Sequence, residues 1–185
     1  GLIASGDVDN VLLITAETYS RFLHPADKGN RSIFGDAAAA ILISAKPAGG
    51  RIGKVVLGTD GKGAKNLIVK NGAMRFSKTA DQSMQEDAEG NLFNHNYLYM
   101  NGAEIFNFTL ESVPVLVKDI LQRNQLQQED IDLFVFHQAN KFMLDYLRKK
   151  IKIPSERFFI SMEHCGNTVS STIPIAMKHA LSEGK

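Results

Sequence analysis

Two short apolar runs, each ending in a polar segment that leads into a helical pattern, constrain the fold of this chain more than any other feature. The first run, residues 131–136, ends at the segment HQAN at 137–140. The second run, residues 157–162, ends at the segment HCGNT at 164–168. In α/β proteins the chemistry lies at the carboxyl ends of strands, where a helix begins just behind. The two segments could therefore bring a histidine and an asparagine to one point.

His137 and Asn167 are the candidate catalytic residues of these segments. Imidazole and carboxamide groups both donate hydrogen bonds, so the pair can polarise a carbonyl or hold an enolate oxygen in a site with little water. Structural roles remain open for both residues. A histidine at a strand end is about as often a structural hydrogen-bonding residue as a catalytic one. GNT at 166–168 is also an ordinary turn sequence.

Cys165 is the single cysteine, which excludes an intrachain disulfide. A nucleophile with His137 as its base is a possible interpretation. We disfavour it because Cys165 lies in a turn beside Gly166, whereas a helix N-terminus would lower the pKa of a thiol. A lone cysteine is often just a small buried residue. His164 and Cys165 are adjacent and lack a second pair, so no cluster has zinc spacing and we expect no metal site.

Length and charge exclude several classes of protein. The chain has 185 residues, which is enough for one domain with a sizeable core. A formal net charge of +1 gives no strong field that points to nucleic acid or a membrane surface. No apolar run approaches the roughly 18 residues of a membrane span, and residues 1–6 do not form a secretory signal. Because the chain lacks an initiator Met and opens on what looks like the end of a helix, we expect a fragment or a processed piece.

Apolar patterns elsewhere in the chain predict an alternation of strands and helices. The continuous run NVLLITA at 10–16 is typical of a strand buried on both faces. The segment FGDAAAAILISA at 34–45 fits a helix or a strand, and we predict a strand; residues 51–58 indicate another. An amphipathic helix is predicted from Ala103 onward, and Pro114 should kink or divide it. The alternation favours an α/β fold.

Three segments resemble landmarks of 3-oxoacyl-acyl-carrier-protein synthase III, a family of the thiolase superfamily. They are FGDAAA at 34–39, HQAN at 137–140 and GNT at 166–168, and their order and separations agree with the family. MNGAEIF at 100–106 is similar to the segment before the family's long helix. The resemblance covers nearly the whole chain. It implies an α/β fold of the thiolase-like, layered α-β-α-β-α type, present here in part.

The resemblance also implies how the chain is organised. Residues 1–66 would be the end of the N-terminal thiolase-like half and a connection. Residues 67–185 would be most of the C-terminal half without its last strands, so the chain corresponds to roughly the second half of a subunit. The family's nucleophilic cysteine lies upstream of Gly1, at the start of a helix. Members of the family are cytoplasmic homodimers.

The activity implied is a decarboxylative Claisen condensation in fatty acid or related biosynthesis. In the family, a cysteine takes an acyl group from acyl-coenzyme A. A histidine and an asparagine, here His137 and Asn167, bind the thioester carbonyl of malonyl-acyl carrier protein and stabilise the enolate that attacks the acyl-cysteine. Coenzyme A and phosphopantetheine thioesters are substrates, so no cofactor is implied, and neither nucleic acid nor a membrane is an expected partner.

Four further positions match substrate-binding residues of the family. Arg21 matches a basic residue that contacts coenzyme A, and Gly102, Phe106 and Asn140 match residues that line the pantetheine tunnel. At Phe142, many members carry an arginine on the face that docks the carrier protein. This departure allows a specialised-metabolite ketosynthase that uses coenzyme A thioesters. A non-catalytic thiolase-fold partner subunit is a separate alternative.

Overall fold

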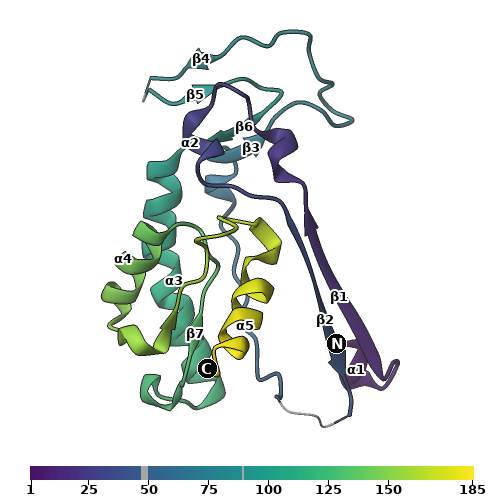
Figure 1. Ribbon diagram of the computed structural model, residues 1–185, viewed down its shortest axis with the longest axis vertical. Helices are drawn as coiled ribbons and strands as arrows, with labels where there is room; N and C mark the ends of the chain where they lie inside the picture. The colour runs from purple at the N-terminus through teal and green to yellow at the C-terminus, as the bar shows by residue number, and fades with distance from the viewer. Residues whose placement is uncertain (47–49, 89) are drawn as a thin grey trace.

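A short parallel strand pair lies between two helices of the computed structural model, which describes residues 1–46, 50–88 and 90–185. Strand β7 (Phe134–Val135) pairs with β8 (Phe158–Phe159). Helix α4 (Lys141–Ile151) follows β7, and helix α5 (Thr172–Ser182) follows β8 (Figure 1). The two strand–turn–helix units expected from the apolar runs are therefore confirmed.

The two helices cover opposite faces of this strand pair. Successive side chains of a strand point to opposite faces, so each strand contributes to two clusters. The cluster on the α4 side contains Phe134 of β7 and its strand partner Phe158 of β8. It also contains Leu144 of α4 and Ile153, which follows α4. The cluster on the α5 side contains Phe159, Ala176 and Ala180, with Val135 packed against it. The result is an α-β-α arrangement built on very short strands.

Helix α3 (Gly102–Asn124) lies beside α4 and adds Val117 to the core on that side. It begins at Asn101, whose side chain accepts a hydrogen bond from the Glu104 N–H at 3.1 Å. Pro114 lies inside this single continuous helix, so the predicted alternative of a division is wrong, and the alternative of a kink stays a prediction. A proline removes one backbone hydrogen bond, and packing of the apolar face outweighs that loss.

Strands β1 (Asn10–Glu17) and β2 (Ala37–Ser44) form an antiparallel ribbon, seen at the right in Figure 1. Both strands were predicted, and both are confirmed. The predicted burial of 10–16 on both faces is wrong, because Leu12 and Ile14 are 59% and 63% exposed. Helix α5 contacts β2 on one side of the ribbon, while no described element covers the apolar side chains on the other.

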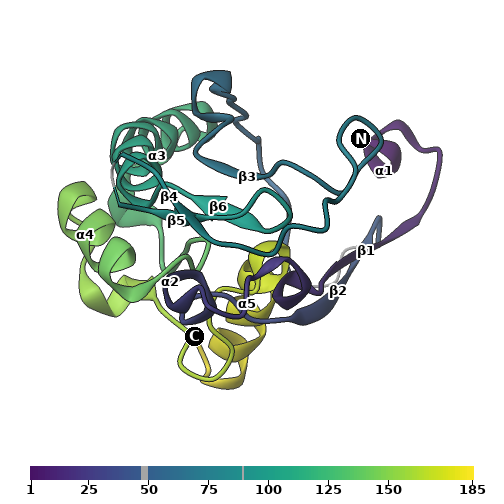
Figure 2. The ribbon, with the colours of Figure 1, turned by 90° about the horizontal axis from the view of Figure 1, so that it is seen from above.

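The remaining α-helices and strands are short, and all except the helix nearest the N-terminus lie towards one end of the molecule, at the top of Figure 1; Figure 2 shows that end facing the viewer. They are α1 (Leu2–Ser5), α2 (Lys28–Arg31), the antiparallel pair β3 (Leu67–Val69) and β6 (Leu98–Met100), and the antiparallel pair β4 (Gln85–Glu86) and β5 (Leu92–Phe93). Residues 51–58 form no strand, so that prediction is wrong. Two glycines weaken this run, and it has no strand partner in the described chain. None of the described helices is both long and apolar enough to cross a bilayer.

Candidate active site

Gln138 joins the ends of the two central strands. Its side chain is 1% exposed, and its Nε2 donates to the Phe136 carbonyl at 2.7 Å and to the Phe159 carbonyl at 3.4 Å. Its Oε1 accepts from the Ser161 N–H at 2.8 Å. A buried amide is stable when its donors and acceptor are paired in this way. Gln138 thus holds the HQAN segment against the end of β8, a role that the sequence analysis missed.

His137 lies between this anchored residue and the start of α5. Its Nδ1 is 2.7 Å from the Thr172 hydroxyl oxygen, which belongs to the first residue of α5. The residue keeps an exposed side, and the protein packed around the rest of the ring lowers the pKa of His137 below its usual value. The neutral imidazole is therefore favoured at pH 7.

Asn167 is held by backbone pairing with the segment that precedes β2. Its N–H donates to the Ile33 carbonyl at 2.9 Å, and its carbonyl accepts from the Gly35 N–H at 3.0 Å. The side chain is 6% exposed, and Oδ1 accepts from the Val169 N–H at 2.9 Å. This bond leaves Nδ2 as a donor, with no hydrogen-bond partner within the described chain. The FGD and GNT motifs, far apart in sequence, are therefore in direct contact.

Two glycines make this contact possible. Gly166 has φ +63°, and a Cβ there would lie 2.7 Å from the Ile33 carbonyl oxygen. A Cβ on Gly35 would collide with the backbone carbonyl of Cys165. Both positions therefore require glycine for close backbone approach, and Gly166 also needs it for its left-handed conformation.

Replacing Gly35 should loosen the contact that positions Asn167. We expect Gly35→Ala to lower the free energy of unfolding by about 1–3 kcal/mol, because the added methyl must displace a backbone carbonyl. Gly58→Ala is the matched control, since a Cβ at Gly58 has nothing within 4 Å and the change should be within about 0.5 kcal/mol. Urea unfolding followed by circular dichroism measures both. Equal effects of the two variants would contradict the close-approach argument.

A chain of hydrogen bonds connects the two candidate catalytic residues. His137 contacts Thr172, whose hydroxyl is 3.0 Å from the Val169 carbonyl oxygen. The N–H of Val169 in turn donates to Asn167. The structure thus places His137 and Asn167, 30 positions apart by their numbers, in one network. Thr172 and Val169 were missed from sequence, where only their position just after the GNT motif could have drawn attention to them.

Three of the four predicted substrate-binding residues lie around the first turns of α3 and α4. Asn140 caps α4, because its Oδ1 accepts a backbone N–H of the first turn at 2.8 Å. Phe106 stacks on Phe142 with ring centroids 5.6 Å apart and meets Tyr146 edge-on at 5.5 Å. Gly102 opens α3, and a Cβ there would have no neighbour within 4 Å. Their contacts with substrate remain a prediction.

Arg21 lies apart from these three, in an exposed turn at Tyr19–Phe22. Within the described chain, no hydrogen bond joins its side chain to any of them. The turn is held by Asp36, which accepts from the Ser20 N–H at 2.8 Å and the Ser20 hydroxyl at 2.6 Å. The hydroxyl and N–H bonds from Ser20 lower the pKa of Asp36, which favours the ionised carboxylate.

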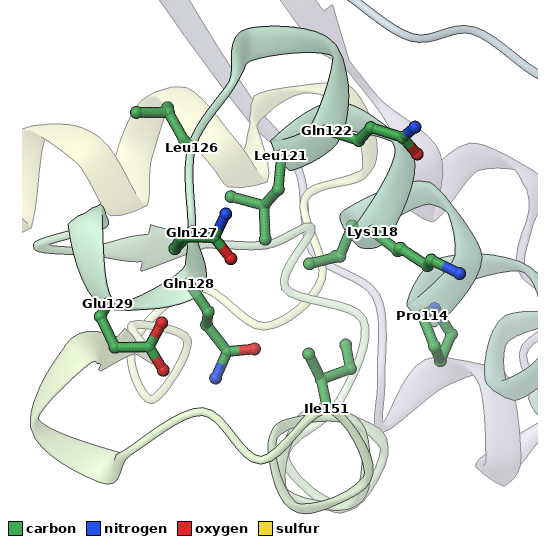
Figure 3. Close-up of a pocket in the computed structure, with 10 residues that line it drawn as sticks. Pro114, Lys118, Leu121, Gln122, Leu126, Gln127, Gln128, Glu129 and Ile151 are labelled. Carbon is green, nitrogen blue, oxygen red and sulfur yellow. The ribbon is translucent and has the colours of Figure 1, made fainter.

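Two cavities of similar size open beside α4, one near its start and one near its end. One of about 560 Å³ is lined by Asn140 and Cys165 together with neighbouring residues, but not by His137 or Asn167. The other, of about 570 Å³, lies between α3, the following loop and the end of α4, where Leu121 and Ile151 face each other (Figure 3). That second cavity contains none of the predicted site residues. Among the described residues, no three His, Cys, Asp or Glu side chains gather as a metal site would require.

Comparison with known proteins identifies the family. Residues 1–61 match the family model described as 3-Oxoacyl-[acyl-carrier-protein (ACP)] synthase III. Residues 121–185 match the one described as 3-Oxoacyl-[acyl-carrier-protein (ACP)] synthase III C terminal. The chain belongs to the 3-oxoacyl-acyl-carrier-protein synthase III family. The family resemblance inferred from the HQAN, GNT and FGD motifs is confirmed.

Members of this family match the chain along its whole length. A Beta-ketoacyl-[acyl-carrier-protein] synthase III of Clostridium perfringens is 33% identical over 183 residues, which cover 99% of this chain and 54% of the relative. A crystal structure of a 3-oxoacyl-(acyl-carrier-protein) synthase III is 51% identical, with a TM-score of 0.93, and the match covers 100% of this chain and 55% of that one. The enzyme from Burkholderia xenovorans LB400 is 35% identical, with a TM-score of 0.82, covering 99% and 51%.

The chain therefore spans about half the length of the relatives that it matches. The predicted thiolase-like α/β fold, present in part, is confirmed by these structures. The division into residues 1–66 and 67–185 stays a prediction, as do the roles of the individual site residues.

Proposed function

We propose that a protein of the relatives' full length that contains this chain is a 3-oxoacyl-acyl-carrier-protein synthase III. It is an acyltransferase that condenses an acyl group from acyl-coenzyme A with malonyl-acyl carrier protein. The observation that carries this proposal is the network of His137 and Asn167 at the carboxyl ends of β7 and β8, in a member of this family. The family's fold alone would be a weaker reason, because one fold supports many functions.

In the proposed reaction, the protein must mainly stabilise the negative charge that develops on the thioester oxygen. When the malonyl thioester loses carbon dioxide, the electrons of the breaking C–C bond move onto the thioester oxygen and form an enolate. Nδ2 of Asn167 is the donor that would bind this oxygen, with His137 beside it. Because Oδ1 of Asn167 is already held by a backbone N–H, the amide is oriented before substrate arrives. Oriented donors of this kind stabilise a developing oxyanion without reorganisation.

The enolate carbon then attacks the carbonyl of an enzyme-bound acyl thioester, and the thiolate of that thioester leaves. We place this acyl group on a cysteine outside the present chain. Cys165 is a poor candidate, because it lies in a turn rather than at a helix N-terminus, where nucleophilic thiols are activated. Its sulfur has one weak contact in the described chain, to the Gly166 carbonyl at 3.7 Å.

Replacing Cys165 tests the alternative interpretation in which this thiol is the nucleophile and His137 is its base. In an enzyme of the relatives' full length, Cys165→Ser should leave condensation unchanged, because the proposed reaction does not use this thiol. The measurement is turnover with acyl-coenzyme A and malonyl-acyl carrier protein, together with iodoacetamide labelling with and without acyl substrate. Loss of condensation in Cys165→Ser, with labelling at Cys165 blocked by acyl substrate, would show that Cys165 carries the acyl group. Hydrolysis of acyl-coenzyme A without malonyl-acyl carrier protein, also lost in Cys165→Ser, would support a cysteine hydrolase instead.

Phe142 favours a second candidate function, a specialised ketosynthase that uses coenzyme A thioesters. The residue is 70% exposed and stacks on Phe106, so it presents an apolar surface where many family members carry an arginine. Comparing kcat/KM for malonyl-acyl carrier protein with that for malonyl-coenzyme A separates the two candidates. A protein inactive with both acceptors would be a non-catalytic thiolase-fold partner.

We also propose that the full-length protein is a cytoplasmic homodimer, as the resemblance implies. The apolar face of the β1–β2 ribbon supports an association with further polypeptide, because large exposed apolar patches are typical of interfaces. The mass of the full-length protein in solution tests the dimer, and cell fractionation tests the compartment.

A further inference from the structure

Thr172 makes two hydrogen bonds with one hydroxyl group. Its Oγ1 lies 2.7 Å from Nδ1 of His137 and 3.0 Å from the carbonyl oxygen of Val169. A carbonyl oxygen can only accept, so the contact with Val169 requires the hydroxyl proton of Thr172. The hydroxyl has no second proton to give to His137. Both bonds form together only when Nδ1 of His137 carries a proton and donates it to Thr172.

Val169 adopts the backbone conformation that this network needs. Its φ is +54°, in the left-handed region that β-branched residues rarely enter. In this conformation its N–H donates to Oδ1 of Asn167 and its carbonyl accepts from Thr172. Such strain persists only where the surroundings hold it, and it clusters at functional sites. One strained residue therefore orients both candidate catalytic side chains.

We propose that Thr172 is a positioning residue that holds the imidazole proton of His137 on Nδ1 and leaves a lone pair on Nε2. The position of the proton follows from the hydrogen-bond geometry and does not depend on the proposed function. Only its consequence for the reaction rests on the proposed function. In neutral histidine, the bond made by one ring nitrogen decides which nitrogen carries the proton. Within the described chain, Nε2 of His137 has no hydrogen-bond partner that would oppose this arrangement.

The two candidate catalytic residues then differ in character. Asn167 presents a donor through Nδ2, while neutral His137 presents an acceptor through Nε2. To donate to an enolate oxygen as Asn167 does, the ring of His137 must first gain a second proton. The sequence predicts that both residues donate hydrogen bonds. While His137 is neutral, this arrangement leaves only Asn167 as a donor to the enolate oxygen.

The test is ¹⁵N NMR of a full-length protein that contains this chain, labelled at histidine and recorded where His137 is neutral. The signals of His137 are assigned by their loss in His137→Gln. We expect the proton on Nδ1 in the wild type and in Thr172→Ser, which keeps the hydroxyl. In Thr172→Val, which keeps the shape without the hydroxyl, we expect the proton to move to Nε2. Unchanged circular dichroism shows that the variant is folded.

Each outcome decides the proposal. A wild-type ring protonated on Nε2 would overturn it, and so would a Thr172→Val ring that keeps its proton on Nδ1. If Thr172→Val does not fold, the wild-type and Thr172→Ser spectra still decide where the proton lies. The readout needs no turnover, so a protein with the Nδ1 proton but without condensing activity would retain this inference and refute the proposed function.

Discussion

In a full-length enzyme that contains this chain, His137→Ala should nearly abolish decarboxylation of the malonyl thioester and leave acyl transfer to the nucleophile largely intact. The reason is that His137 is proposed to act where the enolate charge develops, a step that acyl transfer does not include. Removing one group that stabilises an oxyanion typically costs about 2.7–4 kcal/mol, or roughly 10²–10³ in kcat. The two half-reactions are measured separately, as carbon dioxide release and as acyl-enzyme formation.

His164→Ala is the matched control for this prediction. His164 lies in the same stretch of chain as Asn167, but it is exposed, and within the described chain no hydrogen bond joins its side chain to the network. Its replacement should leave both half-reactions unchanged. If His137→Ala lowers acyl transfer and decarboxylation equally, the histidine is a general structural support of the site rather than a group that acts on the enolate.

The 185-residue chain by itself should have no synthase activity and should self-associate. Condensation requires a covalent acyl-enzyme, and Cys165, the single cysteine, lies in a turn two residues before Asn167 rather than at the start of a helix. Within the described chain every sheet has two strands, so both outer edges of the β1–β2 ribbon lack strand partners. Leu42, 67% exposed, adds to the apolar surface of that ribbon. Unpaired edges and exposed apolar side chains both favour association.

The measurements are the mass of the purified chain in solution and its turnover with acyl-coenzyme A and malonyl-acyl carrier protein. A full-length protein assayed in parallel shows that the substrates are active. A monodisperse monomer would refute the argument from the ribbon. Turnover by the chain alone that disappears in Cys165→Ser would overturn the assignment of the nucleophile to a cysteine elsewhere.

Local patterns in the sequence were enough to predict the units that carry the site. The apolar runs before 137–140 and 164–168 end in polar segments followed by helices, and the structure has a strand–turn–helix unit at each. Such units can be predicted because burial of a strand and periodicity of a helix are properties of neighbouring residues. The motifs within the two segments identified the family for the same reason.

Pairing and burial could not be predicted in this way. Residues 10–16 form the expected strand, yet their exposure depends on which element covers each face of the β1–β2 ribbon. Residues 51–58 have the composition of a strand but no strand to pair with in the described chain. Pro114 lies within one continuous helix because the packing of α3 beside α4 outweighs a local preference.

By itself, the sequence determined the two strand–turn–helix units and the choice of His137 and Asn167 as candidates. Only the tertiary structure decided how those two residues are connected. Thr172 lies 35 residues after His137, and their 2.7 Å contact exists because the loop after β8 brings the first residue of α5 beside the segment that follows β7. A hydrogen bond depends on distances of a few tenths of an ångström. Such distances are set by strand register and by the close approach at Gly35, which no local pattern of residues encodes.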